Sequence, residues 1–63
     1  MRVNLINARK EKGYTQKQVA EYLGIAERSY QDIEYGKYIG QIKHWDKLED
    51  LFKIHQRTLR EII

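Results

Sequence analysis

The chain has 63 residues with no cysteine and no proline, a length that gives one small domain and excludes a multi-domain enzyme. Without cysteine there is no disulfide, thiolate metal site or cysteine nucleophile; this fits a reducing compartment, and we expect a cytoplasmic protein. Twelve Lys and Arg against nine Asp and Glu give a net charge of +3, which suits a polyanionic partner, and no apolar run is long enough to span a membrane.

The first two predicted helices come from helical apolar spacing and from their end signals. The first block has Leu5 and Ala8 on its apolar side and stops at Gly13, because glycine accepts the left-handed conformation that ends many helices. Thr15 then offers a hydroxyl to cap a second helix, over residues 16–23.

The remaining helices follow the same logic. A third is predicted over residues 27–35, with a glycine as its stop, and a loop over residues 37–41 follows. The fourth helix is marked by a stripe of apolar residues: Ile42, Trp45, Leu48, Leu51 and Phe52. A fifth, terminal helix is predicted from a last apolar block: Leu59, Ile62 and Ile63. Residues 1–63 are therefore predicted to form one all-α domain, without repeat or linker.

The third predicted helix separates polar from apolar side chains. At about 100° per residue, the polar side chains that reach furthest share one face: Glu27, Arg28, Gln31, Asp32 and Tyr35. Tyr30 and Ile33 point the other way, into the core, with Ser29 and Glu34 at the margins. Such a face suits a helix that lies in the major groove of duplex DNA and reads base edges. The alternative is an ordinary solvated face.

The segment from Tyr14 to Lys37, YTQKQVAEYLGIAERSYQDIEYGK, resembles the helix-turn-helix of the phage-repressor (Cro-like) family. The residues in register with the pattern of that family are Tyr14, Thr15, Gln16, Val19, Ala20, Leu23, Gly24, Ile25, Ile33, Glu34 and Gly36. The register continues backward to Arg9 and forward to Ile54, so the resemblance covers nearly the whole chain. It implies a five-helix, lambda-repressor-like fold and a transcriptional regulator that binds double-stranded DNA sequence-specifically.

The resemblance also implies which residues contact DNA, and they lie on and around the second and third helices: Thr15, Gln16, Lys17, Glu27, Arg28, Ser29, Gln31, Asp32, Lys37 and Tyr38. Gln16 is expected to grip a phosphate and to brace the start of the recognition helix. Glu27, Arg28 and Asp32 occupy base-reading positions, and the planar guanidinium of Arg28 can bind guanine O6 and N7 together. The alternative for Arg28 is a salt bridge to Asp32, one turn further on.

Arg9 and Glu34 match a charged pair that in this family joins the first helix to the end of the third, and we expect a structural salt bridge between them.

Two features depart from the family pattern. Ala26 replaces the hydroxyl residue that caps the third helix, and the reading face, with Glu27 and Asp32, is more acidic than a phosphate-rich surface favours.

The implied function is repression by a weak homodimer on an inverted repeat, because a single copy contacts too few bases for useful affinity. Ile39, Ile62 and Ile63 are predicted dimer contacts, since they have no evident role in the core. The alternative function is a protein-interaction module, such as an antitoxin or anti-repressor-like domain, with a protein as its main partner. A protein anti-repressor is also possible as a partner of the repressor.

Enzymatic and metal-binding patterns are absent from the sequence. His44 and His55 are too far apart to share a helical metal site, and we expect both on the surface. We expect no catalysis, no metal and no cofactor. Five tyrosines raise the alternative of single-strand binding by base stacking, but Tyr14 and Tyr30 fall on predicted core positions.

Overall fold

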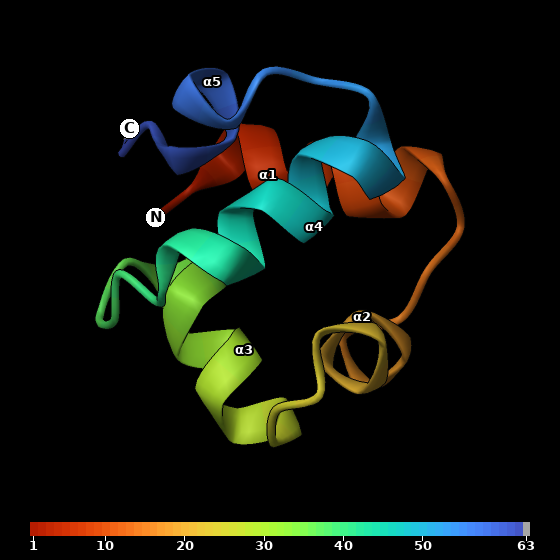
Figure 1. The fold of residues 1–63 in the computed structure, drawn as a ribbon, viewed down its shortest axis with the longest axis vertical. Coiled ribbons are helices and arrows are strands. Elements are labelled where there is room, and N and C mark those ends of the chain that lie inside the picture. The colour runs from red at the N-terminus through yellow and green to blue at the C-terminus, as the bar shows by residue number, and fades with distance from the viewer. Residues whose placement is uncertain (63) are drawn as a thin grey trace.

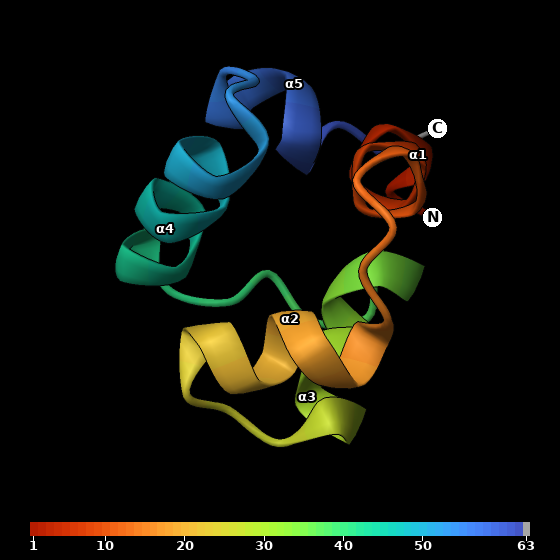
Figure 2. The same cartoon turned by 90° about the vertical axis from the view of Figure 1, so that its right-hand side faces the viewer.

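The computed structural model describes residues 1–62, and these form five α-helices and no strand, which confirms the predicted all-α fold. The helices are α1 (Val3–Glu11), α2 (Gln16–Leu23), α3 (Glu27–Tyr35), α4 (Ile42–Phe52) and α5 (Gln56–Arg60). In Figures 1 and 2, α2 and α3 lie together at one end of the molecule, and α1, α4 and α5 form the other. Within residues 1–62 no helix is both long enough and apolar enough to cross a membrane.

The second helix begins and ends where its local sequence dictates. Thr15 Oγ1 accepts a hydrogen bond from the backbone N–H of Gln18 at 3.0 Å, and Gln18 Oε1 accepts one in return from the Thr15 N–H at 2.8 Å. This reciprocal cap satisfies two donors that the helix itself cannot pair. Gly24, with φ of 75°, ends α2 in the left-handed conformation, so the chain turns sharply into α3.

The core gathers apolar side chains from all five helices. Its buried members are Leu5, Ala8, Val19, Ala20, Leu23, Tyr30, Ile33, Trp45, Leu48, Phe52 and Leu59. The indole of Trp45 also donates from Nε1 to the carbonyl of Ile39 at 2.7 Å, which ties the loop after α3 to α4. The inner face of α3 therefore packs into the core, and its outer face points away from it.

Arg2 was not singled out by the sequence, yet it is buried and joins three parts of the chain. Its guanidinium donates to the carbonyls of Ile33 (2.7 Å), Tyr38 (3.2 Å) and Arg60 (3.1 Å), and it lies over the Trp45 ring. Burial, with a smaller contribution from Arg60, lowers the pKa of Arg2. The residue fixes the C-terminal end of α3 against both chain ends, which lie close together in Figure 1.

Three expectations about α4 and the preceding turns are wrong. Ile42 is 75% exposed, because it is the first residue of α4 and lies beyond the edge of the core. His44 is buried, because it is next to Trp45 on the inward side of the first turn of α4 and accepts a hydrogen bond from the Gln41 N–H. Tyr14 is partly exposed, because it lies on the loop before α2, and its ring is tilted against that of Phe52 with 6.5 Å between the centroids.

The C-terminal end also differs from its prediction. The fifth helix ends at Arg60, so Ile62 lies beyond it and is exposed, and Ile63 lies outside the described residues. Leu59 is completely buried. Its burial closes the core, whereas Ile62 does not extend the helix.

Candidate nucleic-acid interface

The predicted recognition helix has the outward polar face that its spacing indicates. Glu27 and Arg28 are exposed, and Ser29, Gln31 and Asp32 are half-buried along the same helix. Tyr30 and Ile33 are completely buried, so the opposite face packs into the core. The structure therefore presents these polar side chains along the outside of α3, which packs against α2 (Figure 2).

One ion pair lies on this outer face. Arg28 Nε is 3.6 Å from Asp32 Oδ1, one helical turn apart, which matches the alternative weighed from the sequence. The Arg28 side chain is 81% exposed, so solvent screens the pair and its contribution to stability is small. The pair holds the guanidinium near Asp32 and leaves it exposed to solvent.

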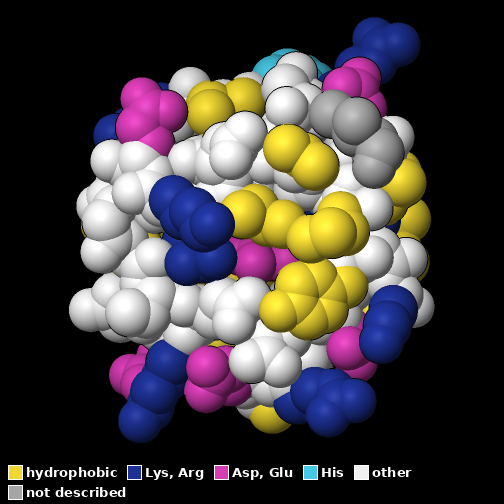
Figure 3. Space-filling view, turned by 180° about the vertical axis from the view of Figure 1, so that it is seen from behind, with side chains coloured by type: hydrophobic (Ala, Val, Ile, Leu, Met, Phe, Trp, Pro, Cys, Tyr) yellow, Lys and Arg dark blue, Asp and Glu magenta, His cyan; other side chains and the backbone are white. Residues whose placement is uncertain are grey.

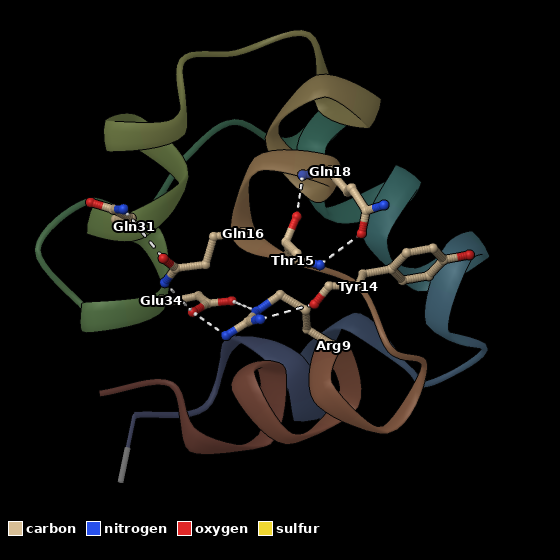
Figure 4. Close-up of polar contacts among 7 residues, drawn as sticks. All are labelled: Arg9, Tyr14, Thr15, Gln16, Gln18, Gln31 and Glu34. Atoms are coloured by element: carbon tan, nitrogen blue, oxygen red, sulfur yellow. Dashed lines mark hydrogen bonds and ion pairs between the residues drawn. The ribbon is translucent and has the colours of Figure 1, made fainter.

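A polar network beneath this face anchors α3 to α1 and α2 (Figure 4). Arg9 on α1 donates from Nε to Glu34 Oε2 at 2.7 Å, which is the salt bridge expected from the sequence. Gln16 on α2 donates from Nε2 to Glu34 Oε1 at 2.9 Å, and Gln31 donates from Nε2 to Gln16 Oε1 at 3.2 Å. Glu34 is fully buried rather than at the margin of the helix, because both of its oxygens have donors from neighbouring helices.

Gln16 braces a different part of α3 from the one expected. Its hydrogen bonds go to Glu34 and Gln31, in the middle and C-terminal half of α3, and not to the helix start. The start has no equivalent support, since Ala26 has no side-chain group to cap the first turn. The network therefore fixes the orientation of α3 through its second half.

Arg9 also fixes the turn that leads into α2. Its Nη1 donates to the carbonyl of Tyr14 at 3.0 Å, just before the cap at Thr15. One guanidinium thus positions both helices of the pair relative to α1. Because these bonds involve an ionised donor, they are stronger than bonds between neutral groups.

Tyr30 lies next to this network and stays protonated. Burial first, and then the Glu34 carboxylate, raise the pKa of its hydroxyl far above the ordinary value of 10.0. Within the described residues the Tyr30 oxygen is buried and meets no partner at hydrogen-bonding geometry. The ring therefore contributes apolar packing behind the outer face of α3.

The predicted phosphate contacts lie at the two edges of the helix pair. Thr15 and Lys17 are exposed at the start of α2, and Lys37 and Tyr38 are exposed on the loop after α3. That loop is fixed to the helix, because the N–H groups of Lys37 and Tyr38 both donate to the carbonyl of Asp32, at 2.9 and 3.2 Å.

The surface seen from behind carries both signs of charge. Figure 3 shows Lys and Arg next to Asp and Glu along the edge formed by α2 and α3, with apolar side chains gathered above them. Over residues 1–62 there is no group of three or more acidic, His or Cys side chains that could hold a metal ion.

A comparison with protein families shows to which family the chain belongs. A family model described as helix-turn-helix matches residues 5–55, most of the chain and all of α2 and α3. Searches of curated proteins and of solved structures gave no significant match. The matched span contains the capped α2, the glycine turn and the outward face of α3, so the sequence match and the geometry agree. The chain belongs to the Cro/C1-type helix-turn-helix family, a non-enzymatic family whose membership implies DNA binding and transcriptional regulation.

Proposed function

We propose that this protein binds double-stranded DNA sequence-specifically, with α3 in the major groove, and represses transcription. The observation that carries the proposal is the outward polar face of α3 on a base fixed by Arg9, Gln16 and Glu34. A helix that reads base edges must hold its register in the groove, and a buried, charge-assisted anchor supplies that register.

Base contacts are assigned to the outer side chains of α3. Arg28 has the geometry for a guanine, and Glu27 can accept from cytosine N4. Gln31 on the same face and Ser29 at its margin are assigned to base or backbone contacts. Asp32 shares this face and is in contact with Arg28.

Phosphate contacts are assigned to residues that flank α3: Thr15, Gln16, Lys17, Lys37 and Tyr38. Gln16 can serve both DNA and protein, because its Nε2 carries two hydrogens and one of them reaches Glu34. Lys37 and Tyr38 sit on a loop whose backbone is fixed to Asp32, so their approach to a phosphate is set by the position of α3.

We also propose that the protein binds an inverted repeat as a weak homodimer. Ile39 and Ile62 are both more than half exposed, and the Ile62 side chain lies against Gly36, at the end of the recognition helix. An interface there would set the distance between two copies of α3, and two half-sites one helical turn apart supply the affinity that one copy lacks. Ile63 is assigned to the same interface and lies outside the described residues. A repressor of this kind acts in the cytoplasm.

The test is selection from a random pool of duplex DNA at moderate salt, followed by sequencing. We expect an inverted repeat with half-sites spaced by about one turn. Arg28→Ala should then relax the preference at one base pair, whereas Lys37→Ala should weaken binding to all sequences alike. Retention without enrichment would contradict sequence-specific recognition. A chain ended at Glu61, which keeps the buried Leu59, should select single half-sites if Ile62 and Ile63 form the dimer.

A second candidate is a protein-interaction module, such as an antitoxin or anti-repressor-like domain, whose main partner is another protein. The observation in its favour is that two carboxylates, Glu27 and Asp32, accompany one guanidinium on the outer face of α3. Salt dependence separates the two functions, because phosphate contacts release counterions and give a steep slope. Failure to bind duplex DNA at low salt would favour the protein partner.

A further inference from the structure

The side chains of Arg28 and Asp32 form an ion pair on the outer face of α3. The contact joins Arg28 Nε to Asp32 Oδ1 at 3.6 Å, so it engages the inner edge of the guanidinium. Nη1 and Nη2 form the outer fork, which is the pair of donors that can reach guanine O6 and N7 together. The ion pair therefore leaves the reading end of Arg28 available.

The two partners differ in their freedom to move. The Arg28 side chain is 81% exposed, whereas the Asp32 side chain is 30% exposed. The backbone at Asp32 is also fixed, because its carbonyl accepts from the N–H groups of Lys37 and Tyr38. Asp32 is thus the more restricted of the two residues, and Arg28 is the more exposed one.

We propose that Asp32 is a positioning residue for Arg28 and sets the preference for guanine at one base pair, rather than reading a base of its own. This inference rests on the proposed function, since it needs duplex DNA in front of α3. An arginine without restraint can swing to a phosphate or to another base edge. A carboxylate that attracts the Nε edge favours orientations in which the fork points outward along the groove.

The same carboxylate lowers the affinity for DNA in general. Asp32 is a negative charge near phosphates and partly cancels Arg28, so it opposes non-specific attraction. Replacing it should therefore raise binding to unrelated duplex DNA while it lowers discrimination. Opposite changes in the two quantities are not expected from a residue with only a structural role.

The experiment compares binding to the selected site with binding to sites substituted at each base pair, using the full chain. In Asp32→Asn, which keeps the shape and removes the charge, we expect discrimination at the base pair read by Arg28 to fall by about three- to ten-fold. Asp50→Asn is the matched control, because it makes the same substitution at an exposed aspartate of α4 that is not among the assigned DNA contacts. It should leave discrimination at that base pair unchanged.

A double variant assigns the effect to the pair. In an Arg28→Ala background, Asp32→Asn should cause no further loss of discrimination at that base pair. Two results would overturn the inference: unchanged discrimination in Asp32→Asn, or a loss at a different base pair, which would make Asp32 a direct reader. Unchanged far-UV circular dichroism and melting temperature would show that the variants are folded. Failure of the unmodified protein to select any site is a separate outcome, which contradicts the proposed function itself.

Discussion

The carboxylate of Glu34 is buried in the core, and its Oε2 lies 2.7 Å from Arg9 Nε. The two residues are 25 positions apart, on α1 and α3, and Gln16 of α2 donates to the second oxygen. These contacts tie α3 to both α1 and α2. Three helices converge on one carboxylate.

Arg9→Ala should destabilise the fold strongly. Removing the guanidinium leaves a buried carboxylate without its charged partner, which costs about 3 kcal/mol of unfolding free energy. For a domain of this size the melting temperature should fall by more than about 10 °C. Urea unfolding followed by the fluorescence of the buried Trp45 measures the change.

Two further variants test the cause of that loss. Arg28→Ala removes an exposed ion pair instead and should change the unfolding free energy by less than about 0.5 kcal/mol. Replacing both partners, Arg9→Met with Glu34→Leu, should be less damaging than Arg9→Ala alone, because no buried charge is left unpaired. Equal losses from Arg9→Ala and Arg28→Ala would contradict the role of the buried pair.

Tyr30→Phe should leave stability unchanged or raise it slightly. The buried hydroxyl has no partner at hydrogen-bonding geometry in the described part of the chain, and an unsatisfied polar group costs about 1–3 kcal/mol. The phenylalanine ring keeps the packing and removes that cost. Chemical denaturation measures the difference, and Tyr30→Leu, which also removes the ring, should be clearly destabilising. A loss of more than about 1 kcal/mol in Tyr30→Phe would reveal a hydrogen bond to Glu34.

Local sequence signals predicted the helix pair closely. Thr15 as a cap and Gly24 as a stop are short-range features, and α2 and α3 have the predicted bounds of 16–23 and 27–35. The apolar spacing also placed Tyr30 and Ile33 inside. Such signals act within one or two helical turns, so they do not depend on the rest of the fold.

Contacts between distant residues were predictable only where the family resemblance supplied them. The pairing of Arg9 with Glu34 came from that register, but the full burial of Glu34 depends on Gln16 as well. Arg2 gave no signal, because its acceptors are backbone carbonyls that only the folded chain brings together. The prediction that His44 lies on the surface was wrong for a similar reason, since its burial depends on how α4 meets the loop before it.

Ala26→Ser should stabilise the recognition helix. Ala26 already has the extended backbone of a cap residue, with φ of −66° and ψ of 148°, but makes no side-chain bond to the first turn. A serine hydroxyl there should add about 1 kcal/mol, or about 4–8 °C in melting temperature. Thr15→Ala is the reciprocal control and should lose about as much, because Thr15 does cap α2. A loss in Thr15→Ala without a gain in Ala26→Ser would show that α3 needs no further cap.

Stability should decrease as the pH falls below 6.5, because of His44. Burial, and then the charges of Lys43 and Lys47, lower the pKa of His44 from 6.5, and its Nδ1 accepts a hydrogen bond from the Gln41 N–H that only the unprotonated ring can accept. The unfolded chain therefore binds the proton more readily, so the contribution of His44 to the unfolding free energy is constant above pH 6.5 and declines from there towards the lower folded-state pKa. Urea unfolding at a series of pH values should show this slope in the unmodified protein and in the control His55→Gln, which replaces the exposed histidine. His44→Gln should lack it. A slope that persists in His44→Gln would assign the pH dependence to other groups.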